Sequence, residues 1–186
     1  MSHYYYKLYK PYGYLSQFIN NQTQRKNKRL LGELGDFPMG VMAVGRLDEK
    51  SEGLLLLTTD GKFSSYMTSH KVEKEYHVMV DGVITESVIA QLRTGVEISV
   101  DGRLYKAKAE HVALLNSTSH IIKRFVRDDR HGSTSWLSMV IKEGKYRQVR
   151  KMTAKIGYPT LRLVRVRVGD YNLGPMKPAD IIPFSY

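Results

Sequence analysis

The order of the expected strands and helices constrains the fold of this chain more than any other feature. Strands are predicted at 3–9, 41–44, 54–58, 74–80, 96–99, 104–114, 119–126, 136–141 and 161–168, and helices at 30–34, 62–69, 85–93 and 146–156. They do not alternate one strand with one helix, as a parallel sheet with crossover helices requires. The sequence therefore predicts an α+β fold, with a largely antiparallel, mixed sheet and flanking helices.

The length and composition fit one folded domain. The chain has 186 residues, of which 42% are apolar and 25% charged, so it can bury a core and a disordered chain is excluded. No repeat, low-complexity tract or interdomain linker is visible, and residues 1–186 are predicted to form a single domain of two lobes. The stretches 17–29 and 127–133 are polar or charged and are expected to be loops.

The charge balance favours a nucleic-acid partner. The chain carries 29 Lys and Arg against 18 Asp and Glu, a formal net charge of +11. An excess of this size attracts polyanions and supports sequence-independent binding to phosphate backbones. Charge alone does not separate this reading from a soluble protein that is merely basic.

Several classes of site are excluded by what the sequence lacks. There is no cysteine, so disulfides, iron–sulfur clusters and thiol nucleophiles are ruled out, in keeping with a reducing cytosol. The six histidines have no metal-binding spacing, and no glycine-rich phosphate loop is present, so no metal and no cofactor is expected. Residues 1–13 contain no apolar signal segment, and the longest aliphatic run, 54–57, is too short to span a membrane. We expect a cytoplasmic protein without a membrane partner.

A polar loop between two apolar runs is the first candidate site. Residues 45–53 join the runs 41–44 and 54–58, which are predicted to be buried strands, so the loop would sit on a rigid edge. Arg46 and Asp48 offer a cation and a carboxylate two residues apart, and such a carboxylate can act as a nucleophile or a general base. The alternative is that Asp48 is an ordinary turn residue.

The predicted helix 146–156 has one basic side. At about 100° per residue, Arg147, Lys151 and Lys155 form a stripe. Arg150 lies outside that stripe, so its side chain is predicted to contact a group other than solvent or phosphate. The alternative is that the stripe is an ordinary solvent-exposed helix face that binds no ligand.

Two strands carry further candidates. The strand 161–168 places Leu163, Arg165 and Arg167 on one face, an unusual composition for pure core that suggests contact with phosphate or base. Tyr76 lies in the strand 74–80, where its ring could stack on an unpaired base. The alternative for Tyr76 is a core tyrosine.

These features coincide with the motifs of a known family. The segment 45–48 (GRLD) with 51–58 (SEGLLLLT) resembles the catalytic motif of one branch of the ribosomal RNA pseudouridine synthases. In the same order along the chain, 10–13 (KPYG), 74–76 (KEY) and 143–152 (EGKYRQVRKM) resemble three further motifs of that branch. Four motifs in order, over almost the whole chain, are not a coincidence.

The resemblance implies a role for each candidate. Asp48 would be the essential aspartate, attacking the target nucleotide or assisting deprotonation of its sugar. Tyr76 would stack on the uracil and later aid removal of its C5 proton, and Arg150 would pair with Asp48. Leu163 would close the apolar wall of the pocket. Arg46 would either hold the flipped-out geometry of the base or fill the space that the base leaves.

The resemblance also implies the fold and the partner. We expect the pseudouridine synthase fold, with a central RNA-binding cleft, no S4-type RNA-binding module and no cofactor. Lys145, Arg147, Lys151 and Arg165 are expected to bind ribosomal RNA, and a monomer that binds no DNA is expected. The segments 135–137, 157–163 and 169–173 resemble most closely the E type of the large-subunit enzymes, whereas 127–133 cannot be aligned with the family. The alternatives are a synthase of small-subunit RNA and a non-catalytic assembly protein with the same fold.

Overall fold

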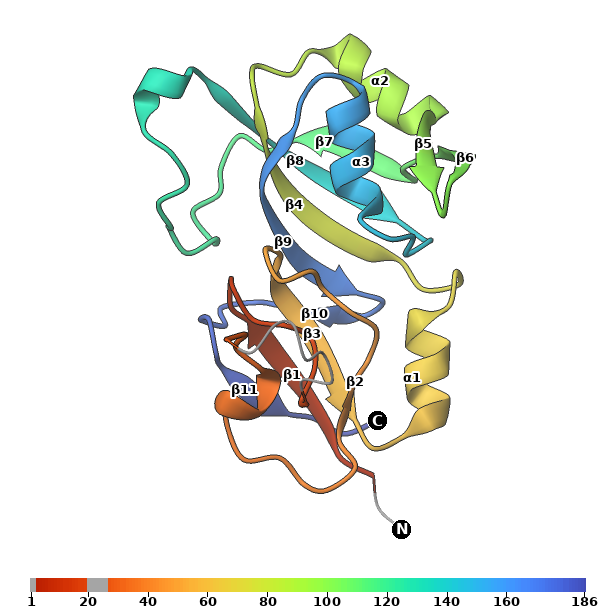
Figure 1. The fold of residues 1–186 in the computed structure, drawn as a ribbon, viewed down its shortest axis with the longest axis vertical. Helices are drawn as coiled ribbons and strands as arrows, with labels where there is room; N and C mark the ends of the chain where they lie inside the picture. Colours follow the sequence, from red (N-terminus) through yellow and green to blue (C-terminus); the bar gives the residue numbers. More distant parts are fainter. Residues whose placement is uncertain (1–2, 20–26) are drawn as a thin grey trace. The chain divides into compact units, whose positions relative to one another are not determined.

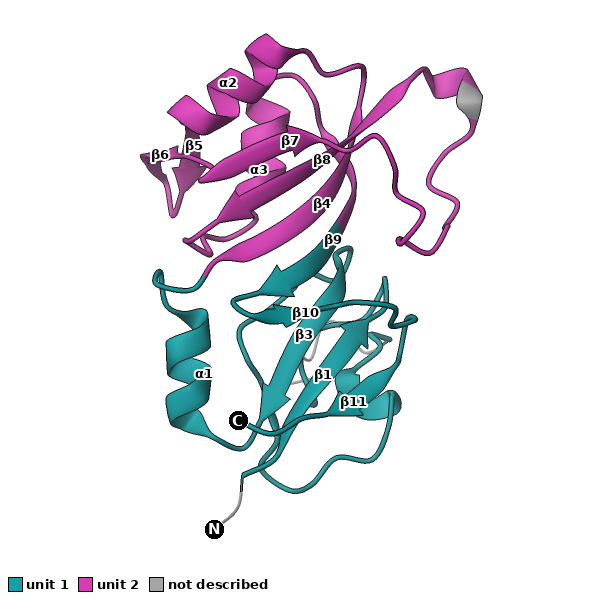
Figure 2. Ribbon diagram, turned by 180° about the vertical axis from the view of Figure 1, so that it is seen from behind, with its two compact units in different colours: residues 1–72, 164–186 teal, residues 73–163 magenta. Residues whose placement is uncertain are grey.

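The chain forms two compact units (Figures 1 and 2). The computed structural model describes residues 3–19 and 27–186. Unit 1 contains residues 1–72 and 164–186, and unit 2 contains residues 73–163. The chain returns to unit 1 within strand β9 (Thr160–Val168). No helix in the described part of the chain is long and apolar enough to cross a membrane.

Unit 1 is a small mixed sheet with one helix. Its elements are β1 (Tyr5–Lys10), the 3-10 helix η1 (Leu31–Glu33), β2 (Met42–Ala43), β3 (Glu52–Thr58), α1 (Gly61–Thr68), β10 (Tyr171–Asn172) and β11 (Ile181–Pro183). Strand β1 lies between β11 and β3 and is antiparallel to both, whereas β3 pairs with β9 in parallel. Every residue of β3 is buried, which makes this strand the centre of the core of unit 1.

Helix α1 begins at a well-formed cap. The carboxylate of Asp60 accepts hydrogen bonds from the backbone N–H groups of Lys62 and Phe63, as an aspartate at an N-cap commonly does. The helix buries Phe63 and Met67. The ring of Phe63 packs edge-on against Tyr5, whose centroid is 5.2 Å away, so α1 is fixed to the sheet by aromatic contacts.

Unit 2 is an antiparallel sheet accompanied by two helices. Its elements are β4 (Lys74–Asp81), α2 (Glu86–Thr94), β5 (Val96–Val100), β6 (Arg103–Ala107), β7 (His111–Leu114), the 3-10 helix η2 (Asp129–His131), β8 (Thr134–Ile141) and α3 (Gln148–Lys155). Strand β8 is antiparallel to β4 on one side and to β7 on the other, and β5 and β6 form a separate hairpin. Helix α2 packs against β7, and α3 packs against β5.

The predicted fold class is confirmed, and so are most of the elements. The helix expected from Thr85 onward is α2, with Thr85 as its N-cap and Gly95 as its C-cap. Two strand predictions were wrong: 119–126 has no regular structure, and 104–114 is interrupted between β6 and β7. The expected loop 127–133 contains the short helix η2. Of the expected loop 17–29, residues 20–26 lie outside the described residues.

Two boundaries near the candidate sites also differ from the prediction. The run 41–44 forms only the two-residue strand β2, and Met42 is 37% exposed, so this run is not a buried strand. The helix predicted from residue 146 begins at Gln148 instead, because Arg147 has a left-handed backbone, with φ +53°. Arg147 is therefore the N-cap of α3, and the expected basic stripe loses its first helical member.

Candidate active site

The loop with Asp48 makes a tight turn before β3. The backbone N–H of Ser51 donates to the carbonyl of Asp48 over 3.0 Å, and the N–H of Val44 donates to the carbonyl of Leu56 in β3 over 2.8 Å. Leu47 is 6% exposed, whereas Asp48 is half-buried and Arg46 is exposed. The loop thus buries its apolar residue and leaves its charged residues at the surface.

Ser16 fixes the middle of this loop. Its hydroxyl donates to the carbonyl of Leu47 over 2.8 Å and accepts the N–H of the same residue over 2.9 Å. Ser16 is 6% exposed, so both bonds are shielded from water. Because Leu47 directly precedes Asp48, this pair of bonds fixes the backbone from which the carboxylate projects.

Lys10 supports the other end of the same loop. This lysine has no exposed surface, and its ammonium donates to the carbonyls of Pro11, Tyr14 and Glu49, over 3.0, 2.6 and 3.4 Å. The carbonyl of Glu49 also accepts the N–H of Gly13 over 2.8 Å. The KPYG turn and the Asp48 loop are therefore held together by one buried cation.

Lys10 also lies within a cluster of charged groups in unit 1. Burial, together with the Arg165 guanidinium, lowers the pKa of Lys10 to about 7, against the opposing effect of the Glu52, Asp48 and Glu49 carboxylates. Glu52 is 2% exposed and Arg165 is 5% exposed. Asp48 thus shares its surroundings with two buried cations of the same unit.

Gly53 allows β3 and β9 to approach closely. Its φ of +102° disfavours any residue with a side chain. A Cβ at this position would overlap the carbonyl oxygen of Arg165 and lie 2.8 Å from its backbone nitrogen. The Nε of Arg165 donates to the carbonyl of Leu54 in β3 over 2.8 Å. Arg165 is thus built into the strand pair beside the loop, and its contact with RNA stays a prediction.

The remaining catalytic candidates lie in unit 2. Tyr76 is 9% exposed on β4, and Leu163 is 5% exposed on β9. Arg150 lies on α3, half-buried, with its Nη1 donating to the carbonyl of Thr160 over 3.5 Å. Asp48 belongs to unit 1, so its pairing with Arg150 stays a prediction.

Three predicted RNA-binding cations gather where α3 begins. The ammonium of Lys145 lies 5.3 Å from the centroid of the Tyr105 ring in β6, and Arg147 is exposed at the N-cap. Lys151 donates to the carbonyl of Ser99 over 2.7 Å, and its ammonium lies 5.2 Å from the Tyr146 ring. These contacts hold Lys145 and Lys151 beside aromatic rings, with Arg147 exposed between them in sequence.

Tyr105 ties this basic group to the loop before α3. Its hydroxyl donates to the carboxylate of Glu143 over 2.9 Å, and that hydrogen bond raises the pKa of Tyr105 above its ordinary value. The amide of Gln148 donates to the other oxygen of Glu143, also over 2.9 Å. The EGKYRQ motif, residues 143–148, is therefore hydrogen-bonded both within itself and to the β5–β6 hairpin.

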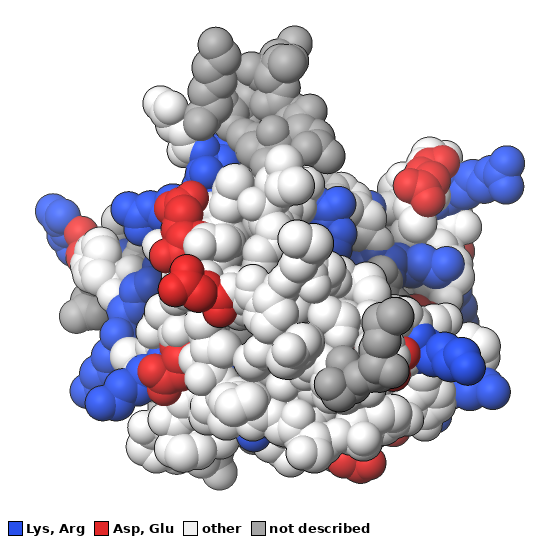
Figure 3. Space-filling view, turned by 90° about the horizontal axis from the view of Figure 1, so that it is seen from below, with Lys and Arg blue, Asp and Glu red and all other residues white. Residues whose placement is uncertain are grey.

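Basic side chains are unevenly distributed on the surface as well. On the face drawn in Figure 3, Lys and Arg gather towards the sides and leave a broad uncharged area between them. Among the described residues, no group of three or more His, Asp or Glu is placed to hold a metal ion. The chemistry on offer is thus that of a carboxylate, cations and aromatic rings.

Ser16, Lys10 and Glu52 are residues whose roles were not predicted from the sequence. Lys10 belongs to the KPYG element, which was interpreted only as a family motif, and Glu52 follows Ser51 inside another motif. A lysine between an apolar strand and a Pro-Gly turn is a detectable signal for a buried cation. Ser16 has no signal in the sequence, because its bonds to Leu47 cross 31 positions of the chain.

Comparison with known proteins then decides the family. Residues 4–155 match the family described as RNA pseudouridylate synthase. The chain belongs to the RNA pseudouridylate synthase family. It is 43% identical over 175 residues to ribosomal large subunit pseudouridine synthase E of Xanthomonas axonopodis pv. citri (strain 306), covering 92% of this chain and 88% of that relative.

Other relatives of this synthase are more distant. Synthase E of Vibrio parahaemolyticus is 42% identical, covering 92% of this chain and 69% of the relative. Ribosomal large subunit pseudouridine synthase B of Bacillus subtilis is 29% identical, covering 95% and 66%. A crystal structure of a pseudouridylate synthase superposes with a TM-score of 0.74 at 26% identity, covering 99% of this chain and 71% of that one. The predicted family and its fold are thereby confirmed.

Proposed function

We propose that this protein converts one uridine of large-subunit ribosomal RNA into pseudouridine. The observation that carries the proposal is the 43% identity to a large-subunit synthase of type E over 92% of the chain. The identity to a type B synthase is only 29% over a similar span, which favours the E type. The protein would work in the cytoplasm as a single catalytic domain.

Asp48 carries the chemistry in this proposal. Its carboxylate acts as a nucleophile or base while the bond between the sugar and N1 of uracil breaks. The uracil then turns within the site and forms a bond from C5 to the sugar, and the C5 proton leaves. The main-chain bonds of Leu47 and Ser51 on either side of Asp48 hold its backbone in place during these steps.

The other candidate residues hold the uracil and the RNA and keep water out of the site. Tyr76 stacks on the uracil and aids removal of its C5 proton, Arg150 pairs with Asp48, and Leu163 supplies an apolar wall that keeps water out. Arg46, the exposed cation of the loop, holds the RNA where the uridine has left its helix. Extruding a base costs on the order of a few kcal/mol, and stacking on an aromatic ring contributes roughly 1–3 kcal/mol in return.

The basic group at the start of α3 binds the RNA backbone. Lys145, Arg147 and Lys151 supply three cations within one short segment, and contacts to phosphate give binding that weakens as salt rises. Arg165 is left out of this group, since its burial and its bond to Leu54 suit a supporting role.

Pseudouridine mapping tests the proposal. Unmodified large-subunit ribosomal RNA is incubated with the protein or with its Asp48→Asn variant, treated with carbodiimide, and read by reverse transcription. One new stop with the wild type alone is the expected result. No stop on naked RNA, precursor particles or small-subunit RNA would contradict the proposal and favour a non-catalytic RNA-binding protein.

A further inference from the structure

A cavity in unit 2 lies at the long connection between β7 and β8. Its volume is about 310 Å³. That is near the lower end of the roughly 300–1,000 Å³ typical of small-molecule sites, so it suits one nucleotide and is too small for a duplex. Met79 of β4, Trp136 of β8 and Arg162 of β9 form part of its lining, and the connection itself supplies the rest.

The lining combines cations with aromatic rings. The side chains concerned are those of Lys123, Arg124, Arg127, Arg162, Phe125 and Trp136. None of the described lining residues is acidic. A nucleotide uses both kinds of group, because its base stacks on rings and its phosphate is attracted to ammonium and guanidinium groups.

The strand register separates this cavity from Tyr76. Met79 and Trp136 are direct partners across β4 and β8, and both line the cavity. Tyr76 is paired with Met139. Since successive side chains of a strand point to opposite faces, Tyr76 lies on the other face of the β4–β8 pair. The cavity is therefore distinct from the place where Tyr76 would stack on the target uracil.

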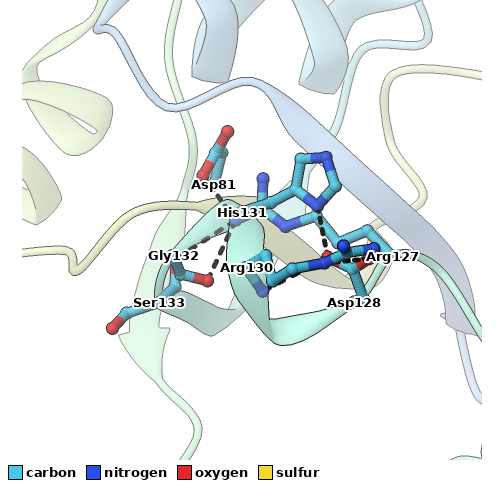
Figure 4. Close-up of polar contacts among 7 residues, drawn as sticks. All are labelled: Asp81, Arg127, Asp128, Arg130, His131, Gly132 and Ser133. Atoms are coloured by element: carbon cyan, nitrogen blue, oxygen red, sulfur yellow. Dashed lines mark hydrogen bonds and ion pairs between the residues drawn. The ribbon is translucent and has the colours of Figure 1, made fainter.

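Arg127 fixes the end of the connection that leads into β8 (Figure 4). Its Nη2 donates to Asp81 at the end of β4 over 2.6 Å, and to the carbonyls of Gly132 and Ser133 over 3.3 and 3.4 Å. The Arg127 guanidinium thus connects the end of β4 to the residues that directly precede β8. The cavity wall has a defined position although it has no regular secondary structure.

Two further contacts hold the first part of the connection. Arg162 donates to the carbonyl of Ile122 over 2.9 Å, and His120 is hydrogen-bonded to His77 of β4 over 2.9 Å. Phe125, between these anchors and Arg127, is 79% exposed. An aromatic ring is thus kept in solvent at the rim of a basic cavity, as a stacking platform requires.

We propose that this cavity binds one unpaired nucleotide of the RNA substrate other than the target uridine, and thereby contributes to the choice of substrate. The inference rests on the proposed function for the identity of the RNA. Phe125 and Trp136 stack on the base, and Lys123 and Arg124 contact its phosphate.

Tryptophan fluorescence tests this inference directly. The chain has 1 tryptophan, Trp136, so its emission reports on the cavity. The wild type is titrated with a single-stranded hexauridylate, and a saturable change in emission is expected. Phe125→Ala and Arg124→Ala should each weaken the affinity by about tenfold. Lys177→Ala, which removes one exposed cation of unit 1, is the matched control and should leave the affinity unchanged.

The design separates this inference from the proposed function. Asp48→Asn should titrate like the wild type, because the readout does not need isomerisation. The inference is overturned if hexauridylate produces no saturable change, or if Phe125→Ala and Lys177→Ala bind equally well. A failed pseudouridine mapping together with normal titration would overturn the proposed activity and support the cavity. The high exposure of Phe125 makes loss of folding in its variant unexpected, and the midpoint of urea unfolding checks this.

Discussion

Two irregular segments of this synthase are held in place by different means. The loop 45–51 is fixed by bonds to its own main chain, from the buried residues Ser16 and Lys10. The connection 115–133 is fixed by long side chains at its ends, chiefly Arg127, and leaves residues such as Phe125 in solvent. The first segment presents Asp48, the carboxylate that we propose to be catalytic, and the second lines the cavity that we assign to a flanking nucleotide.

The difference follows from what each segment must do. A reacting carboxylate has to be held within a fraction of an ångström, and buried backbone bonds provide that. A surface that selects a substrate gains from exposed, adaptable side chains on a loop carried by a rigid sheet. We therefore expect variants in the first segment to change rate or stability, and variants in the second to change RNA affinity.

The largest effect is expected at the reacting group. Asp48→Asn keeps the shape of the side chain but removes its charge, so isomerisation should fall by roughly 10³-fold or more. The fold and the RNA affinity should stay close to those of the wild type. Single-turnover assays and filter binding measure the two quantities, and a variant with normal rate would remove Asp48 from the mechanism.

A large loss of stability is expected at Gly53. Alanine there combines an unfavourable φ with overlap against Arg165, and the two effects together should lower the free energy of unfolding by about 3 kcal/mol. The matched control is Gly61→Ala, because a Cβ at Gly61 meets nothing within 4 Å. Urea unfolding of both variants checks this, and equal midpoints would show that β3 and β9 do not approach as described.

Ser16 should have an intermediate effect. Ser16→Ala leaves the N–H and the carbonyl of Leu47 without their buried partner, which costs roughly 1–3 kcal/mol. The same change should loosen the backbone next to Asp48 and lower the single-turnover rate. Ser65→Ala, an exposed serine in α1, is the control for the loss of a hydroxyl. An unchanged rate in Ser16→Ala would show that the loop does not need the hydrogen bonds from Ser16 to position Asp48.

Lys10 should give stability a distinctive pH dependence. Its pKa of about 7 in the folded protein is below the ordinary value of 10.5, so the unfolded chain binds more protons between those limits. The free energy of unfolding should therefore rise with pH across this window, by at most about 1.4 kcal/mol per pH unit. Lys10→Met should lose this contribution. Urea midpoints at pH 7 and pH 10 for both proteins test it, and parallel trends would contradict it.

A small effect on stability is expected from the part-buried ion pair of the connection. The hydrogen bond from Arg127 keeps the pKa of Asp81 below its ordinary value, so the pair is ionised at neutral pH and is lost only on acidification. Because an asparagine at this position would still accept a hydrogen bond from Arg127, Asp81→Asn should change the urea midpoint little. Trypsin should nevertheless cut the connection faster, at Lys123 or Arg124. Cleavage no faster than in the control Asp170→Asn would show that the pair does not hold the segment.

The sequence was informative where local pattern and long-range packing agree. Alternating and apolar runs predicted most strands of both units, although not β10 and β11, and the helix predicted at 85–93 is α2. Motif order identified the family before any geometry was known. The candidate residues Arg46 and Asp48 were correctly placed on a loop that leads into a buried strand.

The errors have physical causes. Arg147 adopts a left-handed backbone in a sequence that otherwise favours helix, so the start of α3 was misplaced. The segment 119–126 has the apolar residues of a strand, yet Ile121, Phe125 and Val126 line the cavity and do not join a ladder. None of these outcomes can be derived from residues close in sequence.

Release of the C5 hydrogen tests the central claim most directly, because uracil loses that hydrogen only if C5 becomes the point of attachment. Large-subunit RNA labelled with tritium at C5 of uracil is mixed with excess enzyme, and the tritium released to water is followed over a single turnover. We predict release by the wild type, none by Asp48→Asn at equal RNA occupancy, and a normal saturating rate with weaker affinity for Phe125→Ala. Tritium release by Asp48→Asn at the wild-type rate would contradict the account.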